Sequence, residues 1–163
     1  MIVEAILAIL VLIEISPIKQ QLLNCKDNSI LQRFKHTFVH GDIYHLLTNG
    51  ITLYNLLDLE NRLSPQMFLL VVVFLTVVTN FIHKAIDDKC SVGFSGVLFG
   101  LVTIRLGLDG FSTDMLIELA ILLISPSLFS QNVSFTGHLA GVIAGLLLLV
   151  PLALNQRQTS AAV

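Results

Sequence analysis

Charged residues are scarce in this chain of 163 residues: only 12 % are Asp, Glu, Lys or Arg. A soluble globular domain usually has about 25 % charged residues, so the composition excludes that class. Hydrophobic residues make up 55 % of the chain, and the mean hydropathy is +0.85. The net charge of −2 also argues against a nucleic acid as partner. The composition therefore predicts a domain embedded in a lipid bilayer.

Other features are missing as well. The sequence has no internal repeat, no low-complexity tract and no domain linker. We therefore expect a single domain over residues 1–163, with a short polar tail at 155–163. His, Cys, Asp and Glu do not recur at the spacing of metal ligands, so we expect neither a metal ion nor a cofactor.

Apolar runs separated by polar breaks predict an all-α, polytopic membrane protein with six transmembrane helices. A span needs about 20 apolar residues. The expected helices cover roughly 1–15, 41–57, 66–82, 94–108, 114–128 and 136–154. Residues 19–40 are expected to form a polar loop, and His36 and His83 are expected to face solvent.

Polar side chains inside such helices are costly and are therefore candidates for function. His45 and Asn49 are four residues apart and share one helix face, with His40 at the start of the same helix. These three residues could instead only pack a helix interface.

The segment Gly93-Phe94-Ser95-Gly96 opens the fourth expected helix. Glycines allow close approach of a substrate, and a helix N-terminus offers unpaired N–H donors. A serine nucleophile needs such exposure and such donors for a developing oxyanion. The motif is short enough to arise by chance.

Glycines at every fourth position let two helices approach closely. The helix-packing candidates are Gly96, Gly100, Gly137, Gly141 and Gly145. If the two glycine stripes meet, Ser95 and His138 lie near one end of the contact, within hydrogen-bond reach. Taken alone, such stripes are more often only packing devices.

These motifs, in this order, make the chain resemble the rhomboid family of intramembrane serine proteases, from about residue 32 to 154. The family pattern H-x4-H-x3-N, G-x-S-G and H-x2-G-x3-G is present with His40, His45, Asn49, Gly93, Ser95, Gly96, His138, Gly141 and Gly145. The segment Glu60-Asn-Arg62-Leu resembles the E-x-R-L segment of the family, and we expect Glu60 and Arg62 to form a structural pair. Residues 92–99 and 134–141 look most like the rhomboid-related protein 4 type of the endoplasmic reticulum.

The resemblance implies a Ser–His dyad without a third acid. Ser95 is then the nucleophile, and His138 is the general base and later the acid. The groups implied to hold or shape the oxyanion site are His45, Asn49, the Ser95 backbone N–H, Gly93 and Phe94. Phe99 stands where many relatives have a tyrosine that stacks on the base histidine.

The resemblance also implies that the partners are transmembrane protein substrates and the lipid bilayer, with the endoplasmic reticulum membrane as location. Two alternatives remain open. One is a rhomboid-like pseudoprotease that binds membrane clients for degradation or trafficking. The other is a transporter with a histidine proton relay, which would need the internal repeat or broken helix pair that the sequence lacks.

The orientation in the membrane is predicted in two opposite ways. The positive-inside rule places the first loop in the cytosol, because most basic residues lie in the first and third loops. The resemblance places both termini in the cytosol and the site toward the lumen or exterior. In that orientation Cys25 and Cys90 face the lumen, where they either form a disulfide or remain as thiols.

Overall fold

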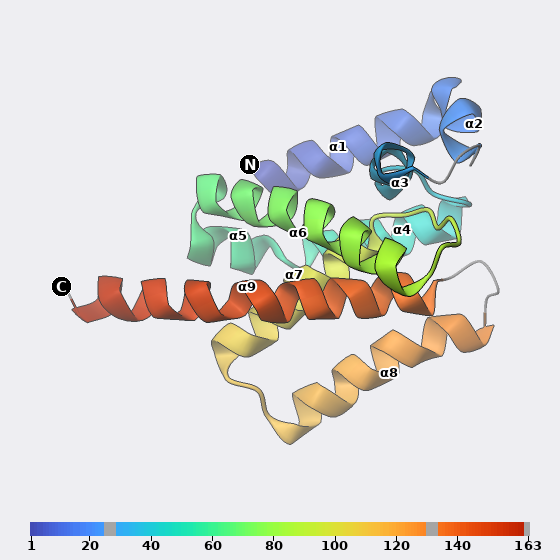
Figure 1. Ribbon diagram of the computed structural model, residues 1–163. Coiled ribbons are helices and arrows are strands. Elements are labelled where there is room, and N and C mark those ends of the chain that lie inside the picture. Colours follow the sequence, from blue (N-terminus) through green and yellow to red (C-terminus); the bar gives the residue numbers. More distant parts are fainter. Residues whose placement is uncertain (25–28, 130–133, 162–163) are drawn as a thin grey trace.

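The computed structural model describes residues 1–24, 29–129 and 134–161 (Figure 1). All regular secondary structure in these ranges is helical, so the predicted fold class is confirmed. The helices are α1 (Ile2–Ile15), α2 (Ile18–Leu23), α3 (Ile30–Thr37), α4 (Ile43–Tyr54), α5 (Leu57–Leu63), α6 (Pro65–Ile86), α7 (Ser95–Asp109), α8 (Thr113–Phe129) and α9 (Phe135–Ala161).

The six expected helices correspond to α1, α4, α6, α7, α8 and α9, and three differences correct the expectation. Residues 19–40 do not form a simple loop, since they contain most of α2 and all of α3. The second expected helix stops at Tyr54 and is followed by the separate helix α5. The tail expected at 155–163 is helical as far as Ala161, because Gln, Arg and Ala extend a helix readily once it is nucleated.

Within the part of the chain that the structure describes, two helical segments are each long and apolar enough to cross a bilayer, namely α6 and residues 135–152 of α9. The helices α1, α4, α7 and α8 have 14, 12, 15 and 17 residues. These four are shorter than the roughly 20 residues that a full span requires. The six expected helices are therefore present, but four of them are shorter than a full span.

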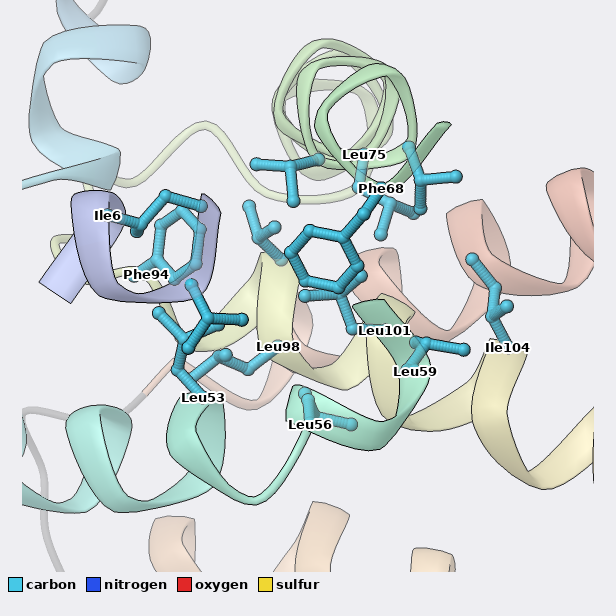
Figure 2. Packing of buried hydrophobic residues seen from close by; sticks show 14 of the residues in the cluster. Ile6, Leu53, Leu56, Leu59, Phe68, Leu75, Phe94, Leu98, Leu101 and Ile104 are labelled. Atoms are coloured by element: carbon cyan, nitrogen blue, oxygen red, sulfur yellow. The ribbon is translucent and has the colours of Figure 1, made fainter. Parts of the chain in front are cut away.

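A compact apolar core lies between α1, α4, α6 and α7 (Figure 2). Phe68 and Leu75 project from α6 toward Leu101 of α7, and Phe94 and Ile6 close the core beside them. These side chains are buried, and in a bilayer their close packing rather than their removal from water holds the helices together. The core fixes the start of α7 relative to α6.

The outer surface is also apolar. Many large hydrophobic side chains of α6, α8 and α9 point outward, among them Leu70, Val73, Phe81, Leu116, Ile117, Ile121, Leu146, Leu147 and Val150. In α8, which lies at the edge of the bundle beside α9, Leu119 is the one buried side chain among residues 113–124 (Figure 1). Contiguous apolar surface of this extent suits hydrocarbon rather than water.

The two glycine stripes meet where α7 packs against α9. A Cβ atom placed on Gly141 would collide with the backbone of Gly96, and one on Gly145 would lie 2.6 Å from the carbonyl oxygen of Gly100. Only glycine permits this approach of the two backbones. The contact sets how far the first turn of α7 lies from the first turns of α9.

Candidate active site

Ser95 and His138 lie side by side at one end of the α7–α9 contact. Ser95 is the first residue of α7, and His138 lies in the first turn of α9. The Nε2 atom of His138 is 3.0 Å from the Oγ atom of Ser95, a hydrogen-bonding distance. The Phe99 ring stacks on the His138 imidazole with 4.3 Å between centroids and 24° between planes. The histidine is only 4 % exposed, so its ring is held facing the serine.

A tight turn at Gly93 and Phe94 places Ser95 at this position. Gly93 has a φ of +111°, a conformation that other residues rarely adopt, and a Cβ there would collide with the His45 ring. The Gly93 N–H donates to the carbonyl of His36 at 3.0 Å. Phe94 is fully buried and its ring lies 5.8 Å from that of Phe38. The turn is therefore held on both sides and requires glycine.

The N–H groups of the first turn of α7, including that of Ser95, have no acceptor within the helix. They can donate to negative charge that develops on a substrate, and the helix dipole favours such charge there. His45 lines the same open pocket as Ser95 and Gly93. His45 and the N–H groups at the start of α7 therefore face one pocket.

Asn49 contacts His40 and is not among the residues that line the pocket at Ser95. Its amide nitrogen lies 2.7 Å from Nε2 of His40, and both side chains are buried. The rings of His40 and His45 pack edge to face with 5.1 Å between centroids. Asn49 and His40 thus support His45, while one amide hydrogen of Asn49 is already used.

Buried polar side chains continue from this pocket, and the sequence-based expectation missed them. His36 and His83 are 1 % and 4 % exposed and do not face solvent as expected. The reason for His83 is that α6 continues to Ile86, so that this residue stays on the buried helix face. The signal was present in the sequence, because the buried apolar stripe of α6 continues at helical spacing as a polar one. The polar residues of this stripe are Thr76, Thr79, Asn80 and His83.

Arg33 of α3 lies against this histidine although it is only 2 % exposed. Its Nη1 atom is 3.0 Å from Nδ1 of His83, and its Nη2 atom donates to the carbonyl of Asp87 at 3.0 Å. Burial lowers the pKa of Arg33 from its ordinary value, and the nearby charges of Asp88 and Asp87 oppose that shift. Arg33, His83 and Asn80 line the pocket together with Ser95.

Glu60 and Arg62 have separate partners, which corrects the expected pair. Glu60 is buried and its carboxylate accepts from the backbone N–H groups of Ile2 and Val3 at 2.8 and 3.0 Å. Arg62 donates to the carboxylate of Asp109 at 2.6 Å. The two side chains project from one helix toward different elements, because residues two apart do not share a helix face.

Two further expectations concerned the cysteines and a metal site. Cys90 is disulfide-bonded, and the chain's other cysteine, Cys25, lies outside the described residues. Among residues 1–24, 29–129 and 134–161, no group of three or more His, Cys, Asp or Glu side chains is placed to hold a metal ion.

Comparison with known proteins agrees with the motifs. The Rhomboid domain family model matches residues 27–155. A protein of Acanthamoeba polyphaga mimivirus whose name describes it as a rhomboid protein is 32 % identical over 151 residues, covering 89 % of this chain and 86 % of that protein. Rhomboid-related protein 4 of Homo sapiens is 31 % identical over 130 residues, and Rhomboid-like protein 15 of Arabidopsis thaliana is 28 % identical over 131 residues.

The second and third relatives are longer than this chain. The aligned parts cover 66 % and 65 % of this chain, but only 41 % and 32 % of the human and plant proteins. The matched region contains both helices that are long enough to span a bilayer. The chain belongs to the rhomboid family of membrane-embedded helical proteins.

Proposed function

We propose that the chain is an intramembrane serine endopeptidase that cleaves peptide bonds in or near transmembrane segments of membrane proteins. The observation that carries the proposal is the distance of 3.0 Å between Ser95 Oγ and His138 Nε2 at the N-terminus of α7. A nucleophile within hydrogen-bond reach of a base, next to free backbone N–H groups, is the arrangement that acyl transfer requires.

The reaction follows from these atoms. Ser95 Oγ attacks the carbonyl carbon of the scissile bond while its proton moves to His138 Nε2. The oxyanion accepts hydrogen bonds from the Ser95 N–H and from His45. When the C–N bond breaks, the His138 imidazolium gives its proton to the leaving amine, and an acyl-enzyme remains. Water, deprotonated by His138, then hydrolyses the ester and returns Ser95 to its hydroxyl form.

The surroundings support access of both water and a membrane-embedded substrate. The pocket at Ser95 is open and is lined largely by polar residues, so water can reach the serine. The outer faces of α6, α8 and α9 are apolar, so a substrate helix can approach through lipid. The cleaved bond must leave its helix to reach Ser95, which favours substrates with small or helix-breaking residues near that bond.

Location and orientation are part of the same proposal. The similarity to rhomboid-related protein 4 supports the endoplasmic reticulum membrane, with both termini in the cytosol and the site toward the lumen. This orientation follows the similarity and not the count of positive loop charges, which points the other way.

The alternative is a pseudoprotease that binds membrane clients without cutting them. Such a protein has no need for a serine and a histidine at hydrogen-bonding distance, or for the stacked Phe99 that orients the histidine. The geometry of the dyad therefore favours the protease.

The test uses purified protein in lipid vesicles with a fluorogenic transmembrane substrate. We expect the wild-type protein to cleave it and Ser95→Ala and His138→Ala to fall to background. Ser112→Ala is the matched control, because Ser112 also stands at a helix start and caps Met115 but is remote in sequence from both motifs. A fluorophosphonate probe should label Ser95 in the wild type and not in His138→Ala. Equal cleavage by wild type and Ser95→Ala would refute the proposal.

A further inference from the structure

The buried His83 contacts two serines, each of which precedes a residue of the dyad by one helical turn in sequence. Ser91 lies four residues before Ser95, and Ser134 lies four residues before His138. His83 Nδ1 is 3.3 Å from Ser91 Oγ, and His83 Nε2 is 3.3 Å from Ser134 Oγ. The histidine therefore bridges the segment that leads into α7 and the segment that leads into α9.

The donors and acceptors of this bridge follow from its two ends. A guanidinium can only donate, so His83 Nδ1 accepts from Arg33 and its Nε2–H donates to Ser134. The Ser91 hydroxyl donates to the same Nδ1 lone pair, which it shares with Arg33. At the other end Thr136 donates to the Asp87 carboxylate at 3.1 Å. The hydroxyl of Ser134 consequently donates to Thr136 Oγ1, from which it is 3.1 Å away. The chain of hydrogen bonds runs in one direction from Arg33 to Asp87.

Ser134 connects the bridge to the base. Its Oγ atom accepts from the Gly137 N–H at 3.0 Å, which is the capping bond of the first turn of α9. Its carbonyl accepts from the backbone N–H of His138 at 3.1 Å. Because His138 lies in this first turn, a shift of Ser134 also shifts the imidazole relative to Ser95.

We propose that His83 is a positioning residue for the dyad: through Ser91 and Ser134 it holds the starts of α7 and α9 at the separation that places His138 Nε2 on Ser95 Oγ. It acts through these two serines and takes no proton from Ser95. The inference rests on the proposed protease function. A displacement of about 1 Å at reacting groups can cost about a hundredfold in rate, so this bridge bears directly on turnover.

Two substitutions separate the halves of the bridge. His83→Asn places an amide oxygen near the position of Nδ1, which keeps an acceptor for the buried Arg33 but loses the link to Ser134. His83→Gln places its amide nitrogen near the position of Nε2, which keeps a donor for Ser134. We expect His83→Asn to lower kcat about tenfold or more with KM changed less than about twofold, and His83→Gln to recover most of kcat.

The control is Thr76→Val on the same helix. Thr76 is buried and its hydroxyl donates to the carbonyl of Val72, outside the bridge. We expect this variant to keep the kcat of the wild type. Ser134→Ala should lower kcat as His83→Asn does, and the double variant should be no slower than the slower single one, because both remove the same link.

Kinetics, the rate of fluorophosphonate labelling and thermal unfolding are measured on every variant. His83→Asn with unchanged kcat and labelling rate would overturn the inference. Equal losses in the Asn and Gln variants, accompanied by equal losses of thermal stability, would show a merely structural role and would overturn it too. A wild-type protein that neither cleaves nor is labelled would refute the proposed function itself. A wild type that cleaves, but no faster than His83→Asn, would refute only the role of His83.

Discussion

The two ends of the helix bundle are held by different chemistry (Figure 1). At the end that carries Ser95 and His138, mostly buried polar side chains contact one another: Asn49 with His40, His83 with Ser134, and His138 with Ser95. The charged Arg33 and Asp87 take part in the same network. At the opposite end, charged groups join the helices: Glu60 with the first turn of α1, Arg62 with Asp109, and Arg105 with Asp58.

The difference follows from what each end must do. In the proposed reaction Ser95 and His138 need fixed directions, and buried hydrogen bonds give direction because their strength depends on the angle at the hydrogen. The opposite end only needs to stay closed. The buried Glu60 binds the first turn of α1 there, and the ion pairs of Arg62 and Arg105 are partly exposed and each contribute little. Substitutions at the dyad end should therefore change turnover, whereas substitutions at the opposite end should change only stability.

Among substitutions at the dyad end outside Ser95 and His138, the largest loss of kcat is expected for Asn49→Ala. The substitution removes the amide that supports His40 and, through it, His45, which donates to the oxyanion in the proposed reaction. Loss of one oxyanion donor typically lowers kcat by about 10²–10³. Asn55→Ala is the matched control at the other end of α4, where the side chain is exposed. A kcat for Asn49→Ala within threefold of the wild type would contradict the special role of the dyad end.

Gly141→Ala should break the contact that both ends share. A methyl group there collides with the backbone of Gly96, which cannot move as a flexible side chain would. Overpacking usually costs about 1–3 kcal/mol, and we expect the upper part of that range in thermal or denaturant unfolding, together with loss of cleavage. Gly50→Ala is the control, since its methyl group would only reach ordinary contact with Leu7 at 3.6 Å and alanine favours the helix. Equal stability of the two variants would contradict the close backbone packing.

Glu60→Gln tests the opposite end. The carboxylate accepts from two backbone N–H groups at the positive end of α1, and an amide would turn a donor toward one of them. Leaving a buried donor unsatisfied costs about 1–3 kcal/mol of stability. We expect that loss in an unfolding measurement and an unchanged kcat per folded molecule. A fall in kcat at full stability would show that this end also takes part in turnover.

The elements that the sequence predicted best are those with strong local signals. The apolar runs predicted α6, α7, α8 and α9 to within a few residues at most ends, since each run is bounded by Pro, Gly or charged residues. The motif around Ser95 and the glycines of α9 predicted that Ser95 and His138 lie within hydrogen-bond reach, and their side chains are 3.0 Å apart, because glycine spacing indicates where two backbones can touch.

The prediction failed where a residue's surroundings come from distant parts of the chain. His83 was expected to face solvent, yet its burial depends on Arg33, Ser91 and Ser134 from three other segments. Glu60 was paired with Arg62 by sequence proximity, whereas its partners lie 57 and 58 residues away at the start of α1. Such contacts are long-range, and neither composition nor local periodicity contains them.

The smallest effect is expected for Arg62→Gln, and it sharpens the contrast with Arg33. The Arg62–Asp109 pair is short at 2.6 Å, but both side chains are 35 % exposed. Exposed pairs usually contribute about 0.2–1 kcal/mol and are screened by salt. We therefore expect a loss within this range in unfolding measurements at low salt, a smaller loss at 1 M salt, and unchanged cleavage. Arg33→Gln should instead lower stability at both salt concentrations, because the buried guanidinium is the donor that His83 and the Asp87 carbonyl share. If the two variants responded alike to salt, burial would not distinguish the two ends of the bundle. The contrast between the buried hydrogen bonds at the dyad end and the exposed ion pairs at the opposite end would then be wrong.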